Sequence, residues 1–375
     1  MDATQAIKLA SARAWRTYLG GKMLDEFYGV TQAKDSHFPE EWIMSVVSAR
    51  NAGREAIQDE GLSMVAGAMP PVSLKSLITA NPAGFLGREH VACFGESTGV
   101  LVKLIDAAER LTVQAHPDRP TAKALFHSDF GKTECWHILD GRPVNGQPPC
   151  IYLGFKPGVT REQWIALFEC QNLHDMLDCL HRFEVHEGDT FLIEGGIPHA
   201  IGAGCFLVEI QEPTDYTIRV ERTTPSGFQV ADFMCHQGLG FERMFDCFTY
   251  GGFTREETQK RWKIPPALLR EERGGHETEL IGYQNTDYFR MTELKIDSSL
   301  QLDAEASFSG IYVLSGKGTI CANGVRQAFQ KGDQFFLPAQ LKELAIQKAS
   351  DQECRILRCY GPKPAVKQVI DHVQM

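Results

Sequence analysis

Short apolar or alternating segments, separated by turn residues, dominate this chain from about residue 99 onward. The clearest of them are GVLVKLIDA (99–107), LTVQAHPD (111–118), ECWHILDG (134–141) and CIYLGFK (150–156). Many short strands at regular spacing, with turn signals between them, are typical of a β-sandwich or a β-barrel. The sequence therefore predicts a mainly β fold.

A weak internal repeat indicates two β units of similar design. VHEGDTFLIEGGIPHAI (185–201) and FQKGDQFFLPAQLKELAI (329–346) share a Gly-Asp turn, an aromatic–aliphatic strand, a short turn and a second strand. Since 375 residues also exceed the usual single domain, two copies of a small barrel would fit. We predict a first domain over residues 1–227, a partly helical connection over 228–275 and a second barrel over 276–375.

Local signals add helices and one hairpin to this plan. Helices are expected within residues 5–30, 72–87 and 160–183, with Ser73 or Val72 near the start of the second and Thr160 as the N-cap of the third. Periodicity leaves residues 40–53 open between a strand and a short helix. Asn323–Gly324, after Ala322, predicts a hairpin turn.

Composition excludes several classes of protein. The net charge is −10 and no Lys/Arg run occurs, which argues against a nucleic-acid partner but leaves a small anionic substrate possible. No apolar run is long enough to span a membrane, and no secretory signal is evident at the N-terminus. The eleven cysteines are scattered without a CxxC motif, so we expect reduced thiols and a cytoplasmic protein.

The segment LTVQAHPD raises a chemical question, because one face of a predicted strand carries Thr112, Gln114 and His116. Glu134 begins another predicted strand, and His199 follows a tight turn. Two imidazoles, a carboxylate and an amide oxygen suit Zn²⁺, and do not exclude Mn²⁺, Fe²⁺ or Co²⁺. The alternative for such histidines is a hydrogen-bonded structural role.

A second group of polar residues lies in EIQEPTDYTIRVER (209–222). Glu209 and Gln211 alternate with apolar neighbours and share a face, and Asp215 precedes Arg219 by four residues. These residues could form a proton-transfer and charge-stabilising group; the alternative is a polar strand with a surface ion pair. Lys132 has the corresponding alternative of a solvated turn lysine.

Four of these segments together resemble the type I mannose-6-phosphate isomerases, a zinc-dependent cupin family. They are LVKLIDAAERLTVQAHPD, GKTECWHIL, GDTFLIEGGIPHAIGAG and EIQEPTDYTIR, and EEWIMSVVSAR is similar to an early Glu-x-Trp segment of the family. The resemblance runs over roughly residues 10–360 and implies two cupin-like (jelly-roll) β-barrels with additional helices. It also implies one Zn²⁺, or another divalent ion, with the second barrel lacking metal ligands; the implied ligands are Gln114, His116, Glu134 and His199.

The same resemblance implies roles for the remaining residues. Arg219, Glu209, Asp215 and Lys132 match positions that act in catalysis, and Lys132 with Thr112 matches positions that hold the substrate phosphate. One departure is Tyr18-Leu19-Gly20-Gly21, where the family usually has Trp-Gly-Gly. This departure bears on the identity of the substrate more than on the metal site.

The implied activity is the interconversion of mannose 6-phosphate and fructose 6-phosphate through a cis-enediolate. Two alternatives stay open: a metal-containing sugar-binding or regulatory cupin without activity, and an isomerase or epimerase of another phosphosugar. The general base stays open among Glu209, Asp215 and a metal-bound water, and the oligomeric state is not predicted.

Overall fold

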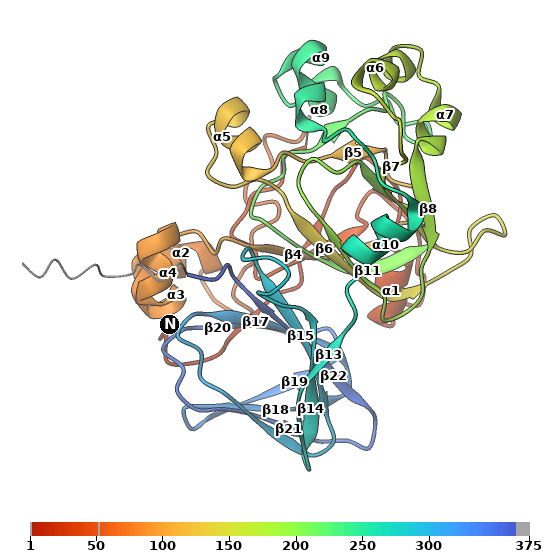
Figure 1. Ribbon diagram of the computed structural model, residues 1–375. Helices are drawn as coiled ribbons and strands as arrows, with labels where there is room; N and C mark the ends of the chain where they lie inside the picture. The colour runs from red at the N-terminus through yellow and green to blue at the C-terminus, as the bar shows by residue number, and fades with distance from the viewer. Residues whose placement is uncertain (1, 52, 365–375) are drawn as a thin grey trace, which may run out of the picture.

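Antiparallel strands make up most of the computed structural model, which describes residues 2–51 and 53–364 (Figure 1). They form four sheets, and each barrel consists of one large and one small sheet. The prediction of a mainly β chain is confirmed.

The first barrel encloses an apolar core between two sheets. The six strands of its large sheet are, in order, β2 (Arg13–Ala14), β3 (Glu40–Ile43), β4 (Leu101–Asp106), β11 (Cys205–Gln211), β6 (Glu134–Gly141) and β9 (Thr190–Ile193). The five strands of its small sheet are β12 (Ile218–Arg219), β5 (Gln114–Ala115), β10 (His199–Ile201), β7 (Cys150–Phe155) and β8 (Leu180–Glu184).

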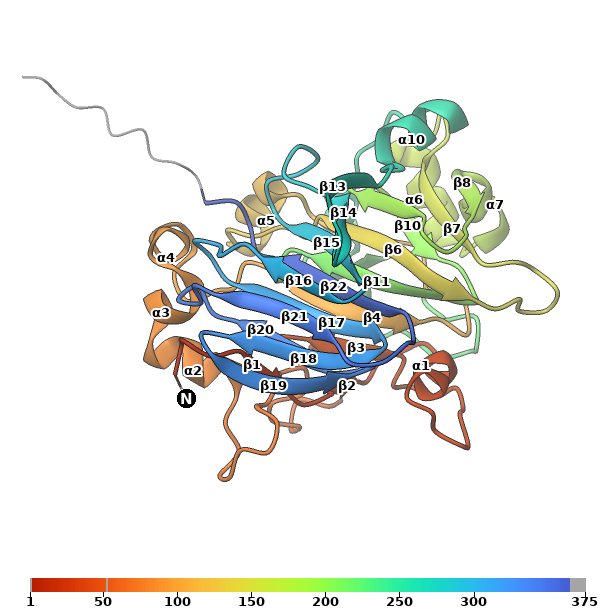
Figure 2. The same ribbon diagram turned by 90° about the horizontal axis from the view of Figure 1, so that it is seen from below.

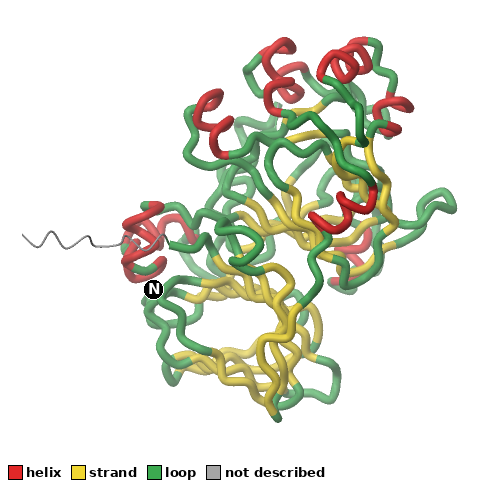
Figure 3. Tube along the Cα trace, in the orientation of Figure 1, coloured by secondary structure: helices red, strands yellow, loops and turns green. Residues whose placement is uncertain are grey.

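The second barrel has the same plan (Figures 1 and 3). Its large sheet contains β1 (Ile7–Leu9), β20 (Gln334–Leu337), β17 (Ser309–Ser315), β22 (Cys354–Tyr360), β15 (Arg290–Ile296), β14 (Gly275–Ile281) and β13 (Ala267–Glu272). Its small sheet contains β16 (Ser299–Leu302), β21 (Leu344–Lys348), β18 (Lys317–Ala322) and β19 (Val325–Gln330).

Strand order explains the internal repeat of the sequence. The series β2-β3-β4-β11-β6-β9 corresponds strand for strand to β13-β14-β15-β22-β17-β20, and β5-β10-β7-β8 corresponds to β16-β21-β18-β19. The two similar segments, 185–201 and 329–346, contain β9–β10 and β20–β21, which occupy equivalent places. The division at residues 227 and 275 stays a proposal; β1 and β13, which it separates from the second barrel, hydrogen-bond into that barrel's large sheet.

The large sheets of the two barrels pack against each other through their outer faces (Figure 2). Because side chains alternate along a strand, Val208 and Ile210 of β11 face the second barrel, where Leu357 and Cys359 of β22 join the same apolar cluster. Residues between them, such as Glu209, therefore face the interior of the first barrel. This arrangement buries β11 on both faces and places polar residues in its interior.

Helices decorate the two barrels. They are α1 (Lys22–Phe27), α2 (Leu74–Ala80), α3 (Pro82–Leu86), α4 (Arg88–Phe94), α5 (Arg119–Phe126), α6 (Arg161–Glu169), α7 (Leu173–Asp178), α8 (Asp232–His236), α9 (Gly240–Arg243), the 3₁₀ helix η1 (Met244–Cys247) and α10 (Arg255–Trp262). Helices α5–α9 gather at the end of the first barrel away from the second (Figure 1). Among the helices of the described ranges, none is long and apolar enough to cross a membrane.

Local predictions had mixed outcomes. Ser73 and Thr160 accept hydrogen bonds as the N-caps of α2 and α6, and the turn at Asn323–Gly324 joins β18 to β19, as predicted. Of residues 40–53, for which the sequence left a strand and a short helix open, residues 40–43 form the strand β3. The helix predicted within residues 5–30 is wrong except at α1, because residues 7–9 pair with β20 and residues 13–14 pair with β3.

Candidate metal centre and active site

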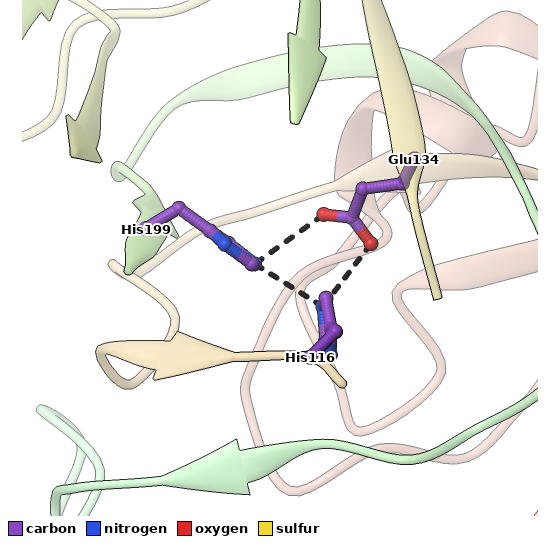
Figure 4. Close-up of side chains that lie close together, drawn as sticks. All are labelled: His116, Glu134 and His199. Carbon is purple, nitrogen blue, oxygen red and sulfur yellow. Dashed lines mark hydrogen bonds and ion pairs between the residues drawn. The ribbon is translucent and has the colours of Figure 1, made fainter. Parts of the chain in front are cut away.

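Three ligand-type side chains meet in the interior of the first barrel: His116, Glu134 and His199 (Figure 4). The two Nε2 atoms lie 3.2 Å apart. Oxygens of Glu134 lie 3.2 Å from Nε2 of His116 and 3.3 Å from Nε2 of His199. All three side chains are fully buried. Three separate segments, the outer two more than 80 residues apart in sequence, thus present their ligand atoms to one point.

Gln114 completes the group. It lies opposite His199 in the β5–β10 register, and the end of its side-chain amide is 3.3 Å from Nε2 of His199. A half-turn of the amide would exchange its nitrogen and oxygen at this position. The strand predicted over LTVQAHPD is shorter than expected, with only Gln114–Ala115 in β5, yet it places Gln114 as the metal hypothesis requires.

Backbone carbonyls fix the orientation of both imidazoles. Nδ1 of His116 lies 2.8 Å from the carbonyl oxygen of Tyr216, and Nδ1 of His199 lies 2.8 Å from that of Ile197. Nδ1 is therefore the protonated nitrogen, because a carbonyl accepts and cannot donate. Nε2 of each ring is left with a lone pair directed at Glu134, which is the usual arrangement for a metal-binding histidine.

The spacing of these atoms fits a small tetrahedral cation. An ion with bonds of about 2.0 Å separates its ligands by roughly 3.3 Å in a tetrahedron. The separations from Gln114 to His199, between the two histidines and from Glu134 to each histidine are 3.2–3.3 Å. One buried oxygen of Glu134, Oε1, has no hydrogen-bond donor in the described protein, as expected of an atom reserved for a cation.

The charge states also suit a metal. Burial, together with the nearby charge of Lys132, lowers the pKa of His116 to about 4, and burial lowers the pKa of His199. Burial opposes ionisation of Glu134, but Lys132 and the histidines outweigh it and hold its pKa well below the usual range. Near neutral pH the site therefore offers two neutral imidazoles and a carboxylate, which need lose no proton to bind a metal.

Lys132 lies at the edge of this group. Its ammonium donates to Oε2 of Glu134 at 2.6 Å and to Nε2 of His116 at 2.8 Å. An ammonium at this point satisfies the same lone pairs that a metal would use. The interior of the barrel is thus a cation site even without a metal, and Lys132 is buried rather than the solvated turn lysine of the alternative reading.

A polar pocket opens beside the four side chains. Gln114 and Lys132 form the wall that it shares with the metal group, and Thr112 also lines it. The other predicted residues, Glu209, Asp215 and Arg219, line the same pocket. The structure therefore brings every predicted site residue to one place, either in the group of Figure 4 or in the adjoining pocket.

The two carboxylates considered for proton transfer are the ends of one chain of buried ion pairs. Asp215 lies 3.2 Å from Arg16, and Arg16 lies 2.8 Å from Glu40. Lys103 lies 3.9 Å from Glu40 and 2.9 Å from Glu209. Negative and positive groups alternate through all five side chains, so each charge has an opposite neighbour in the low dielectric of the barrel.

These neighbours set the charge of the carboxylates. Burial raises the pKa of Asp215, but the charges of Arg16 and Lys103, with smaller effects of other cations, outweigh it and lower the pKa to about 2. Glu40 follows the same pattern, and its pKa is also about 2. Although burial opposes its charge, Lys103 has a raised pKa because of Glu209 and Glu40. Asp215, Glu40 and Lys103 are therefore charged near neutral pH.

Arg219 projects from β12, next to Gln114 in the β5–β12 register. Its Nη1 donates to the backbone carbonyls of Met234 at 2.9 Å and Thr217 at 3.4 Å. These bonds hold the guanidinium at the pocket wall without a carboxylate within 4.0 Å among the described residues. Its charge is therefore available to a ligand.

Three charged residues of the pocket were not predicted as site residues from the sequence: Arg16, Glu40 and Lys103. A signal existed for two of them. Lys103 is the one charged residue in LVKLI (101–105), where a buried strand would not tolerate an unpaired charge, and Glu40 begins the Glu-x-Trp segment. Trp42 donates its indole N–H to Glu40 at 2.8 Å, which explains that spacing. Arg16 lies in a segment that was expected to be helical.

Comparisons with solved structures place this fold among the mannose-6-phosphate isomerases. The crystal structure of the Bacillus subtilis enzyme matches 95% of this chain and 99% of its own, with a TM-score of 0.70 and 21% identity. A zinc-bound mannose 6-phosphate isomerase matches the same shares, with a TM-score of 0.70 and 14% identity. The chain thus has the two-barrel cupin fold that the sequence resemblance implied.

Sequence relatives extend the match beyond the fold. The mannose-6-phosphate isomerase of Streptococcus mutans is 30% identical over 289 residues, which cover 73% of this chain and 82% of the relative. A mannose-6-phosphate isomerase of Bacillus subtilis is 27% identical over 269 residues, or 70% and 77% of the two chains. The family model "Mannose-6-phosphate isomerase, cupin domain" matches residues 279–359. The chain belongs to the mannose-6-phosphate isomerase family.

Proposed function

We propose that this protein is a metal-dependent aldose–ketose isomerase that interconverts mannose 6-phosphate and fructose 6-phosphate. The observation that carries the proposal is the convergence of Gln114, His116, Glu134 and His199 beside a pocket of paired carboxylates and cations. Membership of the family, with relatives named for this reaction, supports the same substrate.

Gln114, His116, Glu134 and His199 would hold one Zn²⁺ per chain. The donor set of imidazole nitrogens and oxygens suits zinc, and a structural neighbour is described as zinc-bound. When bound, such an ion acts as a Lewis acid that polarises the sugar oxygens and orders the open chain.

The reaction moves a proton between C2 and C1 of the open-chain sugar. A base removes the C2 proton, the electrons of the C–H bond form the C1–C2 double bond, and negative charge develops on O1. Return of the proton to C1 of this cis-enediolate, with transfer of the O2 proton to O1, gives the ketose. A carboxylate whose pKa is about 2, as for Asp215, takes up a proton poorly. We therefore assign the proton transfer to Glu209, with Asp215 ionised as the partner of Arg16.

The cations have distinct roles in this scheme. Arg219 has no carboxylate partner among the described residues, and its fixed guanidinium can stabilise the charge that develops on the enediolate oxygens. Lys132 and Thr112, both on the pocket wall, are proposed to hold the phosphate.

The charge of the pocket complements a phosphate dianion. Four cationic side chains face three carboxylates among the described residues that line it, which leaves one positive charge in excess. A divalent ion held by one carboxylate adds a second positive charge. A sugar phosphate with two negative charges balances this total, whereas an uncharged sugar would leave it unbalanced.

A coupled assay of fructose 6-phosphate formation from mannose 6-phosphate tests the proposal, with the protein dialysed against a chelator and then reconstituted with zinc. We expect turnover only after reconstitution. Tight sugar-phosphate binding without turnover in either state would favour the sugar-binding alternative, and turnover of a different phosphosugar alone would change the substrate. Ten of the eleven cysteines, all but Cys93, are free thiols, which supports our proposal of a cytoplasmic enzyme.

A further inference from the structure

The second barrel contains a small pocket at the place that corresponds to the active site of the first. In the first barrel, Glu134 of β6 pairs with Ile193 of β9 and with Gln211 of β11. In the second, Ser309 of β17 pairs with Leu337 of β20 and with Tyr360 of β22. Since these strands correspond in sheet order, Ser309 occupies the position of Glu134.

The same register identifies the other positions. Glu209 lies two residues before Gln211 on β11, and Arg358 lies two residues before Tyr360 on β22, so Arg358 occupies the position of Glu209. Leu344 begins β21, as His199 begins β10. The second barrel therefore has a serine and a leucine in place of metal ligands, and a cation in place of a carboxylate. Ser309, Leu344 and Arg358 all line the pocket.

Arg358 is a buried charge with few partners. Its side chain is only 4% exposed, and its Nε donates to Oγ of Ser309 at 3.1 Å. The guanidinium also lies 4.8 Å from the ring centre of Tyr360. Within the described residues no carboxylate approaches it to 4.0 Å, whereas Arg290 of the same barrel interior lies 3.0 Å from Glu279.

A buried guanidinium with one neutral hydrogen bond is expensive to maintain. An anion in the pocket would offset this desolvation cost, because the two terminal guanidinium nitrogens have N–H donors that it could accept from. Ser309 accepts from Arg358, so its own hydroxyl proton is free to bind the same anion. We propose that Arg358 and Ser309 form a second ligand site, which binds the phosphate or carboxylate group of a small hydroxylated molecule.

The rest of the pocket defines this class of ligand. Asp303, Glu305 and Ser307 are the other polar residues that line it, beside Leu337, Leu341 and Leu344. Asp303 and Glu305 lie near the arginines 270 and 290, at 3.9 and 3.8 Å, and their oxygens can accept hydrogen bonds from ligand hydroxyls. Two carboxylates disfavour a large multiply charged anion, and the enclosed volume of only about 10 Å³ admits little more than one polar group, so the rest of a small ligand must extend to the open side of the pocket.

Calorimetric titration of the zinc-loaded protein tests the site, with glycerol 3-phosphate as the phosphate probe and glycerate as the carboxylate probe. The variants are Arg358→Met, Ser309→Ala and the control Arg326→Met, in which an exposed arginine of the same barrel is removed. Binding at the active site is common to all four proteins. We expect wild type and Arg326→Met to bind one more equivalent of a probe than Arg358→Met, and Ser309→Ala to bind it several-fold more weakly.

Thermal unfolding separates a ligand site from a structural role. In probe-free buffer, we expect Arg358→Met to unfold at the wild-type temperature or above it, because an unpaired buried charge is removed. The probe should raise the unfolding temperature of Arg358→Met less than that of wild type. Equal stoichiometry in wild type and Arg358→Met for both probes would overturn the proposal. If Arg358→Met does not fold, unchanged probe affinity in Ser309→Ala would do so.

Discussion

Removing the charge of Lys103 provides a demanding test of the ion-pair chain. Lys103 is 3% exposed, and its ammonium lies 2.9 Å from Glu209 and 3.9 Å from Glu40. Lys103→Met keeps the length and apolar stem of the side chain. Glu40 keeps Arg16, but among the described residues Glu209 keeps only the indole N–H of Trp136, at 3.1 Å.

The expected loss follows from this geometry. Breaking a buried ion pair by removing one partner costs about 3–5 kcal/mol, because a charge is left without compensation. Because Lys103 also lies 3.9 Å from Glu40, its removal affects two carboxylates, and we expect the loss of unfolding free energy to lie in the upper half of that range. Adding Glu209→Gln removes the orphaned charge while retaining an acceptor for Trp136, so the double variant should recover most of the loss.

Urea unfolding followed by tryptophan fluorescence measures the effect. All five tryptophans lie between β1 and β13, outside the strands of the second barrel, so the signal reports on the first. The matched control is Lys123→Met, which breaks an exposed pair with Asp129 and should cost no more than about 1 kcal/mol. The reasoning is refuted if Lys103→Met lies within 1 kcal/mol of wild type, or if the double variant is less stable than the single one.

Three further predictions concern the pocket. Arg219→Ala should lower kcat/KM by about 10²–10³-fold with unchanged zinc content, because a preorganised donor to the developing oxyanion is lost; near-normal turnover would exclude this role. Lys132→Met should raise KM for mannose 6-phosphate while zinc affinity, measured by competition with a chelator, stays equal or increases, because a competing ammonium is removed; weaker zinc binding would contradict this. The pKa of Glu40 in the folded protein, about 2, lies below its unfolded value, so Glu40 stabilises the fold above pH 4.5 and loses that contribution as the pH falls toward 2. The difference in unfolding free energy between metal-free wild type and Glu40→Gln should therefore shrink over this pH range. A constant difference would count against the lowered pKa.

The candidate site residues of the first barrel were predictable because they occur in short sequence motifs. Gln114 and His116 stand two residues apart on one strand face, and Lys132 and Glu134 repeat that spacing. Each residue alone is compatible with a structural role. Their combination in family order made the resemblance specific, and the folded chain brings them within hydrogen-bond distance.

The pocket wall was less predictable because it depends on pairing between distant segments. Arg16 and Asp215 are separated by 199 residues, and no local pattern relates them. The helix expected within residues 5–30 fails for the same reason: residues 7–9 complete a sheet edge more than 320 residues away. Tertiary pairing there overrides a local pattern that resembles a helix.

The internal repeat carried more information than its weak sequence signal indicated. The sequence showed a Gly-Asp turn in each copy and the absence of a histidine from the second. Only the strand register reveals that Arg358 stands where the first barrel has Glu209. The two barrels thus share a topology while their interiors carry different chemistry.

Metal analysis of three purified proteins, wild type, His199→Ala and His137→Ala, determines whether the group of Gln114, His116, Glu134 and His199 holds zinc. His137 lies on the strand of Glu134 but contacts Thr190 instead of the metal group, so it is a matched control. One zinc ion should remain with each chain of wild type and of His137→Ala, and almost none with His199→Ala. Full zinc occupancy in His199→Ala would contradict the account.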